Sequence, residues 1–389
     1  MWQSPAEGRD AGAVRRPGAW LRLGGAAGPA PGAEEIERAA RSCGAVVLEP
    51  RETEAAARLK AAEPTLTVLC RKRTFVVDER ETGPARSTGL GWEQAAATGQ
   101  WLAVDRAGRT IAWDDRPGLR QLRIWDPECR AAWTETVARE LAGSPFDGVL
   151  VDDLDLGSHP LDLPLPDLGS ESQLRDAHDA LVAEAGEALA EAGRILVATV
   201  GDARRSPGRW RSLSEWGGVC EPRWLATASG RMLDPGAARQ QAARIAPEAA
   251  EGVPADRLVL VHMPIAASLL RRPSIGQTEI DQLVLCGLAQ VWILGGGRGL
   301  FSAGSGDGAQ AHWIPEMQWD LGRPLGPPEG VVSVVSREFE RGWAVVNLAS
   351  DGRRRRHVAV PDGLVGPDGR QARGTVVLGA HQGLVLRRA

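Results

Sequence analysis

Tyrosine is absent from this chain and phenylalanine occurs only four times, so its aromatic side chains are mostly the 14 tryptophans. Any aromatic platform for a ligand must therefore be tryptophan or phenylalanine. Lysine is scarce as well, because Lys60 and Lys72 are the only lysines among 46 basic residues. The net charge of −4 supplies no general attraction to nucleic acid or to an acidic membrane. We therefore expect neither as a partner.

Cysteine and histidine are too few and too scattered to indicate a zinc site or a disulfide framework. The five cysteines are odd in number and far apart, and none forms a CxxC pair. The six histidines include no HxH or HExxH motif. We expect buried free thiols, no metal and no cofactor. The cysteines are Cys43, Cys70, Cys129, Cys220 and Cys286.

Long hydrophobic runs are also missing. No run approaches the roughly 18 apolar residues of a membrane span, so none is predicted. Residues 1–18 form a polar tail without the apolar core of a signal peptide. This pattern predicts a cytoplasmic protein, although a secreted protein whose signal peptide had been removed would show the same pattern. The sequence gives no indication of oligomeric state.

Residues 19–328 consist of short apolar runs that alternate with helical patterns, as in an α/β protein. Eight such runs fit the strands of a (β/α)8 barrel, whose usual length is about 250 residues. An open doubly wound sheet is the alternative architecture. The eight candidate strands are Ala19–Leu23, Ala45–Leu48, Leu66–Leu69, Gly148–Val151, Ile195–Val200, Gly218–Cys220, Leu258–Val261 and Gln290–Leu294.

Two helices between these runs are well marked. The first covers 127–141, with Asp126 as N-cap and Pro127 at the first helical position. The second covers 172–192 and ends at Gly193. Weaker helical patterns occur at 33–41, 235–246 and 278–288.

The connection at 72–125 departs from this alternation, and we interpret it as a long insertion. It shows no strong helix but contains a possible hairpin, with strands at 101–104 and 110–113. Loops this long are usually functional or disordered, and three tryptophans argue for order here. They are Trp92, Trp101 and Trp113.

From residue 329 to 389 the texture changes again. Short strand-like runs are separated by Asp-Gly pairs, for example Asp351-Gly352 and Asp362-Gly363, and no helical pattern is visible. We therefore predict a small antiparallel β-sandwich domain after the barrel.

The segment FDGVLVDDLD carries the most chemical information. A buried strand at 148–151 runs directly into Asp152, Asp153 and Asp155. Chemistry in such proteins is located at the carboxyl ends of the strands. Glu221 directly follows the candidate strand Gly218–Cys220 and would meet these acids at the barrel mouth. Two carboxylates across a cleft are what glycoside hydrolysis requires.

Other residues at the predicted mouth suit substrate binding. Asp153 and Asp155 are expected to position substrate, and Asp202 and His262 follow or end strands. Trp125 and Trp224 could stack on sugar rings. Asp126 borders the same region. Each has a purely structural alternative: core packing for a tryptophan, a satisfied rim group for His262 and helix capping for Asp126. At the opposite end of the same strand, Asp147 is expected to be structural.

With these residues in view, the chain resembles glycoside hydrolases related to endo-α-1,4-polygalactosaminidase. In that group a strand of the form F-D-G-V-(F/Y)-L-D carries a catalytic aspartate, and FDGVLVDD places that role on Asp152. WGGVCE resembles the segment with the second acid and places it on Glu221, and IWDPE resembles an upstream motif. The resemblance spans about Leu122 to Arg388, including the β-domain segments LGRPLGPPEG, REFERGWAVVNLAS and HQGLVLRR. It implies a (β/α)8 barrel that hydrolyses carbohydrate.

This chain departs from the group at two points. Asp153 replaces the usual Asn beside the catalytic acid, and Gly201-Asp202 stands where an Asn-Gly pair is common. Our first hypothesis is a glycoside hydrolase acting on a poly- or oligosaccharide, with Asp152 and Glu221 as its acid pair. Which of the two is nucleophile or base stays open, and we favour Asp152 for that role and Glu221 as proton donor. Whether the reaction retains or inverts configuration stays open.

Two alternatives follow from the same residues. One is a catalytically inactive carbohydrate-binding barrel, which the extra charge of Asp153 favours. The other is a barrel isomerase or lyase, for which a phosphate-binding glycine loop would argue. The segment GGGRG at 295–299 is a poor version of such a loop.

Overall fold

The computed structural model describes most residues of the chain. They are residues 18–24, 29–113, 116, 118–152, 161, 163–201, 207–226, 232–243, 253–254, 256–265, 277–305, 311–331, 333–349 and 355–389.

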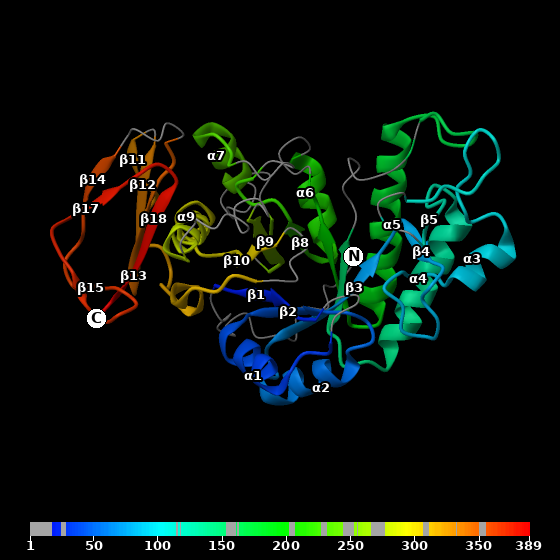
Figure 1. Cartoon of the computed structure of the whole chain (residues 1–389), viewed down its shortest axis with the longest axis horizontal. Helices are drawn as coiled ribbons and strands as arrows, with labels where there is room; N and C mark the ends of the chain where they lie inside the picture. Colours follow the sequence, from blue (N-terminus) through cyan, green and yellow to red (C-terminus); the bar gives the residue numbers. More distant parts are fainter. Residues whose placement is uncertain are drawn as a thin grey trace.

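Eight parallel strands form one sheet, and this confirms the predicted barrel (Figure 1). Neighbouring strands pair in the order β1-β2-β3-β6-β7-β8-β9-β10, and a bridge from Ala19 to Phe301 joins the two ends. The strands are apolar runs buried on both faces, as expected of a parallel sheet. Their bounds are β1 Trp20–Arg22, β2 Ala45–Leu48, β3 Thr67–Arg73, β6 Gly148–Asp152, β7 Ile195–Thr199, β8 Gly217–Glu221, β9 Leu258–Pro264 and β10 Leu300–Gly304.

Helices connect the strands, and the two that the sequence marks most clearly lie close to their predicted positions. In α4 (Pro127–Ala142) Asp126 is the N-cap, and its carboxylate accepts a hydrogen bond from the Glu128 amide at 2.9 Å. Helix α5 (Glu171–Glu191) begins after Ser170, which caps it. The other connecting helices are α1 Ala33–Ser42, α2 Thr53–Ala62, α6 Pro207–Leu213, α7 Pro235–Ala243 and α9 Gln277–Gly295.

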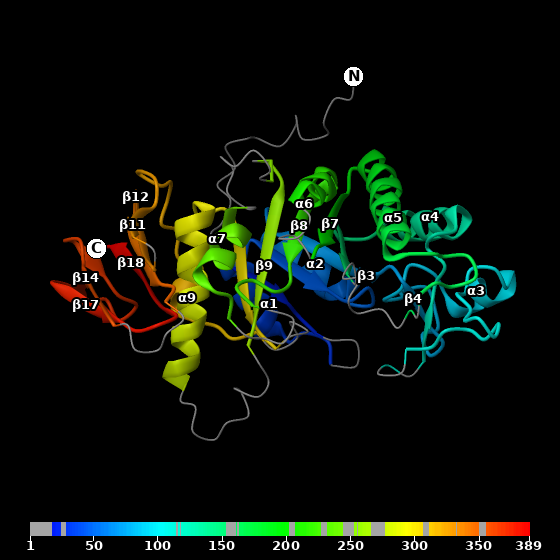
Figure 2. The same ribbon diagram turned by 90° about the horizontal axis from the view of Figure 1, so that it is seen from above.

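The prediction of the eighth strand was wrong. Residues Gln290–Leu294 lie inside helix α9, and the last barrel strand is β10, which begins at Leu300. The run is apolar because α9 is covered on two sides, by the barrel and by the C-terminal sheet (Figure 2). A helix enclosed in this way loses its polar face, so periodicity cannot distinguish it from a buried strand.

The insertion after β3 forms a separate lobe beside the barrel. Strands β4 (Val76–Asp78) and β5 (Leu119–Gln121) pair antiparallel at its base. The predicted hairpin is present, with a bridge between Val104 and Thr110. A short helix, α3 (Trp92–Thr98), also lies in this lobe, and the sequence analysis did not predict it.

The end of the barrel formed by the strand starts is structural, as predicted for Asp147. Its carboxylate pairs with Lys60 at 3.0 Å and accepts a hydrogen bond from the Val68 amide at 2.8 Å. These contacts join α2, β3 and the approach to β6.

The C-terminal strands form the predicted β-sandwich. Six strands pair in the order β11-β12-β13-β18-β15-β16, and β14 with β17 forms a second sheet. A small apolar core including Trp343, Leu364 and Leu386 lies between them. Their bounds are β11 Glu329–Val331, β12 Val334–Phe339, β13 Gly342–Asn347, β14 Arg356–Ala359, β15 Leu364–Val365, β16 Gln371–Ala372, β17 Thr375–Leu378 and β18 Gln382–Arg388.

All five cysteines are free and buried, as the sequence analysis expected. Burial raises the pKa of the Cys286 thiol to about 12, which keeps it protonated at neutral pH. Within the described part of the chain, none of the helices has the length and apolar character needed to span a membrane.

Candidate active site

Strand alternation determines which side chains reach the barrel mouth. Leu69, Leu150 and Val47 belong to the apolar cluster inside the ring. Side chains two positions apart lie on the same face of a strand. Arg71 and Asp152, two positions beyond Leu69 and Leu150, therefore also point inward, but at the carboxyl end of the ring.

Arg22, Glu49, Arg71 and Asp152 form a continuous row of alternating charge at this end of the ring, the charged row. Arg22 Nη2 lies 2.7 Å from Glu49 Oε1, and Arg71 Nη1 lies 3.5 Å from the same oxygen. On its other side Arg71 contacts Asp152 Oδ2 through Nε at 2.7 Å and through Nη2 at 2.5 Å. The row joins β1, β2, β3 and β6 across the mouth.

Asp152 is the most exposed member of this row. The side chain of Glu49 is 3 % exposed and that of Arg71 is 7 % exposed, whereas that of Asp152 is 27 % exposed. A guanidinium at hydrogen-bond distance stabilises a carboxylate charge. Asp152 is therefore a carboxylate that Arg71 fixes in place and that stays partly accessible at the barrel mouth.

Glu52, at the start of α2, adds a buried acid next to this row. Its carboxylate accepts a hydrogen bond from the Glu49 amide at 2.9 Å. Burial raises the pKa of Glu52, and the neighbouring charge of Glu49 raises it further, while that amide hydrogen bond, Arg51 and Arg22 oppose the shift. The acid group is close to the barrel mouth but is itself only 4 % exposed.

Glu221 ends β8 and is 2 % exposed. Its Oε1 accepts a hydrogen bond from the Arg223 amide at 2.9 Å. By alternation it shares the face of Val219, which packs in the outer core, whereas Cys220 belongs to the inner cluster. Its side chain therefore starts from the outer face of the strand end.

Asp152 and Glu221 belong to the same sector of the rim. Strand β7 separates β6 from β8, so the two backbones are roughly 10 Å apart at the usual strand spacing. The pKa of the Cys220 thiol is raised well above its usual value, chiefly by burial and then by the charges of Asp152 and Glu221. Cys220, on the inner face beside Glu221, is thus close enough to Asp152 for the carboxylate charge to affect the pKa of its thiol.

The remaining predicted binding residues differ in position. Trp125 is half-buried directly before the Asp126 cap, and its indole Nε1 has no hydrogen-bond partner among the described residues. Asp126 is a helix cap, the structural alternative considered above. The predicted residues Asp153, Asp155 and Asp202 lie outside the described residues.

Two of the predicted contacts are buried. Trp224 is 0 % exposed and donates its indole N–H to Gly287 O at 3.1 Å, so it is a core residue and does not offer a face to a sugar. His262 is 3 % exposed, and its Nε2 lies 2.9 Å from Ser305 O. Its ring also packs edge-on against Trp20, which fills the ring of strands. These contacts match its alternative as a satisfied rim histidine.

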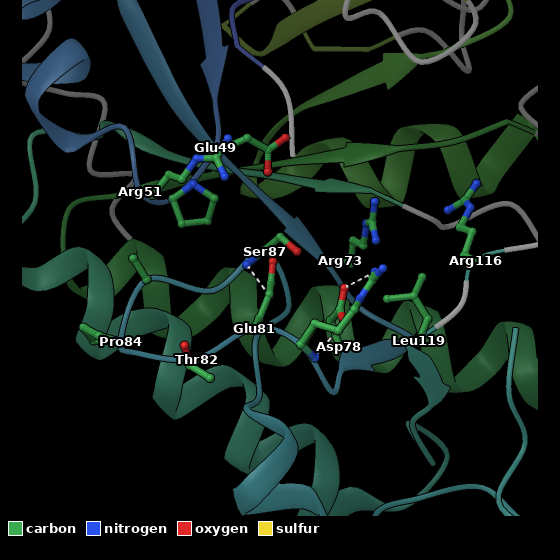
Figure 3. A pocket seen from close by; sticks show the side chains of 13 residues that line it. Glu49, Arg51, Arg73, Asp78, Glu81, Thr82, Pro84, Ser87, Arg116 and Leu119 are labelled. Atoms are coloured by element: carbon green, nitrogen blue, oxygen red, sulfur yellow. Dashed lines mark hydrogen bonds and ion pairs between the residues drawn. The ribbon is translucent and has the colours of Figure 1, made fainter. Parts of the chain in front are cut away.

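A cavity of about 760 Å³ opens beside the charged row (Figure 3). Glu49 and Arg73 belong to its wall, and residues of the insertion complete it. Arg73 is paired in register with Asp152, so one lining residue lies on the strand next to that of the catalytic candidate.

Sequence reasoning missed the cationic half of this site. Arg22, Arg71 and Arg73 sit at the carboxyl ends of their strands, at inward-facing positions. The period of two from Leu69 to Arg73 could have identified two of them. Among the residues described, no group of three or more His, Cys, Asp or Glu side chains is arranged to hold a metal ion.

One family of known proteins is similar to this chain. A model of the family described as "Hypothetical glycosyl hydrolase family 15" matches residues 71–343, a span that contains Arg71, Asp152 and Glu221. A comparison with the curated proteins found no match.

Several solved structures are similar to this chain. The noncanonic maltogenic α-amylase AmyB from Thermotoga neapolitana matches with a TM-score of 0.53 and 9 % identity, over 95 % of this chain and 98 % of that one. An α-amylase from Malbranchea cinnamomea matches with a TM-score of 0.50 and 12 % identity, over 99 % and 98 %. Aspergillus fumigatus Ega3, solved with galactosamine, gives a TM-score of 0.46 and 10 % identity, over 77 % and 96 %.

Proposed function

Because the chain belongs to hypothetical glycosyl hydrolase family 15 and is therefore a glycosidase, we propose that it cleaves a poly- or oligosaccharide with Asp152 and Glu221 as its carboxylate pair. No cofactor takes part in this reaction, since both proton transfer and attack on the sugar are carried by carboxyl groups. The proposal concerns the substrate class and the two acids.

The ion pair between Arg71 and Asp152 is the observation that carries the proposal. A nucleophile or base must be ionised when the sugar arrives, and Arg71 stabilises that charge from β3. Both guanidinium contacts go to Oδ2 and anchor that oxygen against β3. Asp152 is also the most accessible member of the charged row.

Glu221 is proposed as the proton donor. A donor must carry its proton before the glycosidic bond breaks. Asp152 is paired with Arg71, an arrangement that suits an ionised nucleophile or base, so the donor role falls to Glu221, the second acid of the pair. Strand β7 alone separates β6 from β8, so the two acids belong to neighbouring positions of the rim.

The sugar would be positioned by side chains around these acids. We assign this role to Trp125 at the start of α4, and from the sequence alone to Asp153, Asp155 and Asp202. The half-buried ring of Trp125 is the best placed described residue for stacking, since tryptophan faces pack well on the C–H side of a pyranose.

The test is release of new reducing ends from neutral, anionic and amino-sugar polysaccharides by wild type and by Asp152→Asn. We expect wild type to cleave at least one class and the variant to lose at least about 10²-fold in kcat. Asp256→Asn, an exposed aspartate before β9 at the opposite end of the barrel, is the matched control. Equal rates for Asp152→Asn and wild type would contradict the assignment.

The burial of Glu221 favours one alternative, a barrel that binds carbohydrate without cleaving it. In that case wild type would bind oligosaccharides from the same panel in calorimetry and release no reducing ends from any of them. Glu221→Gln would then leave binding unchanged.

A further inference from the structure

The cavity beside Asp152 is walled by three separate parts of the chain. Arg51 follows β2, Arg73 ends β3 and Arg116 belongs to the insertion. Figure 3 shows Arg73 between the other two, with Asp78 and Glu81 along the adjoining wall. At about 760 Å³ the cavity can hold more than a monosaccharide.

The described lining is dominated by arginine. Four arginines and three carboxylates line the cavity, so its side chains carry one net positive charge. Two of the carboxylates form ion pairs with neighbouring guanidinium groups. Glu49 lies 2.7 Å from Arg22, and Asp78 lies 2.8 Å from Arg80.

The arginines are held in place by the protein. The Arg116 guanidinium lies 5.4 Å from the centre of the Trp113 ring, a cation–π contact that orients it. The backbone of Arg73 is fixed by hydrogen bonds from its amide to Ser87 O at 2.8 Å and from Trp133 Nε1 to its carbonyl at 3.1 Å. A guanidinium remains charged at every working pH and matches carboxylate geometry with two parallel N–H groups.

We propose that this cavity is a subsite for an anionic sugar, carboxylated or sulfated, of the polysaccharide cleaved at Asp152. This deepens the proposed function and rests on it. Arg73 connects the two sites, because it lines the cavity and pairs in register with Asp152. A sugar seated against Arg73 would thus bind on the strand that neighbours Asp152. The substrate is an acidic glycan.

The experiment measures binding separately from cleavage, in the Asp152→Asn background. Oligogalacturonate, a sulfated galactan oligosaccharide, a neutral maltooligosaccharide and a chitosan oligosaccharide are titrated by calorimetry. We expect one of the two anionic ligands to bind, with an affinity that falls as salt is raised. Which of them binds separates carboxylate from sulfate recognition.

Variants then locate the site. Arg51→Gln and Arg116→Gln change exposed side chains, so the fold is retained, and each should weaken the anionic ligand about threefold to tenfold. Arg139→Gln, an exposed arginine on α4 that pairs with Glu135, is the matched control and should change nothing. In the active enzyme the same two variants should raise KM for the anionic substrate and leave kcat within about twofold.

The outcomes distinguish this subsite from the proposed activity. Binding of an anionic ligand without any cleavage by wild type would support the subsite and overturn the hydrolase. Cleavage of a neutral or amino-sugar polymer, unaffected by Arg51→Gln and Arg116→Gln, would support the hydrolase and overturn the subsite. Preferential binding of the chitosan oligosaccharide would also overturn it, since the acids of the wall would then dominate.

Discussion

Arg71 and Asp152 form an ion pair across the strand junction of β3 and β6, with both Nε and Nη2 of the arginine on one carboxylate oxygen. Arg71 also faces Glu49, so a single guanidinium lies between two acids at the barrel mouth. This arrangement orients Asp152 without covering it. Arg71 is therefore a positioning residue for the proposed catalytic carboxylate.

Replacing Arg71 tests that role. Arg71→Met removes both contacts to Asp152, so the carboxylate loses its orientation and its neighbouring positive charge. We expect kcat to fall about 10²-fold while KM stays within about threefold, because misplacing a catalytic group by about 1 Å costs on that order. Arg71→Lys keeps the charge and should recover part of kcat. A purely structural role would instead lower the amount of folded enzyme and leave kcat per active site unchanged.

The role of Glu221 as proton donor predicts a dependence on the leaving group. Glu221→Gln should lower kcat by about 10²- to 10⁴-fold on a natural glycosidic bond, whose oxygen must be protonated as it departs. An aryl glycoside of the same sugar with a nitrophenol leaving group needs little protonation, so its cleavage should fall far less. Equal losses on both substrates would show that Glu221 is not the donor. Asp152→Asn provides the comparison, because it should abolish both.

The sequence predicted those features that repeat along the chain or depend on local chemistry. The strand at 148–151, the Asp126 cap and the structural Asp147 follow from patterns of a few residues, and the structure confirms all three. The last barrel strand could not be located, because α9 is enclosed by two layers and reads as a buried strand.

Side-chain environments were harder to predict than elements. Glu221 ends β8 and Trp224 follows it, and only the packing of the folded chain buries both side chains. The segment Arg71-Lys72-Arg73 shows the same limit. Its alternating directions send Lys72 to a buried pair with Glu140 on α4, and Arg71 and Arg73 to the mouth. Among 46 basic residues, composition alone did not single out these three.

The burial of Glu52 predicts a pH-dependent gain in stability for Glu52→Gln. The folded protein raises the pKa of this carboxyl, chiefly by burial, so ionisation costs free energy of folding. That cost is absent below the unfolded pKa of about 4.3 and develops as the pH rises through the folded value. Glutamine stays neutral, and its side-chain oxygen can still accept the hydrogen bond from the Glu49 amide.

Urea unfolding at pH 4 and pH 7.5 checks this sign. Glu52→Gln should match wild type at the lower pH and be more stable at the higher one. The exposed Glu54→Gln, in the first turn of the same helix, is the control and should show a smaller change between the two conditions. If the stability of Glu52→Gln relative to wild type fell between pH 4 and pH 7.5, this explanation would be wrong.

The junction between the barrel and the β-sandwich depends on a glycine. A Cβ at Gly383 in β18 would lie 2.9 Å from the Cα of Cys286 and 3.0 Å from the carbonyl oxygen of Leu285, both in α9. Backbone cannot yield as a flexible side chain does, so Gly383→Ala must push the sheet away from the helix. We expect a loss of about 1–3 kcal/mol in the free energy of unfolding, the usual cost of overpacking.

Gly379→Ala is the control for this junction, because its Cβ would meet only the side chain of Gln382, at 3.2 Å. Urea unfolding followed by the fluorescence of all 14 tryptophans, which include Trp292 in α9 and Trp343 in β13, measures both variants. If α9 is a shared core element, Gly383→Ala lowers the midpoint of a single transition for both regions. A β-sandwich that merely hangs from the barrel would instead unfold separately, and the barrel transition would keep its wild-type midpoint.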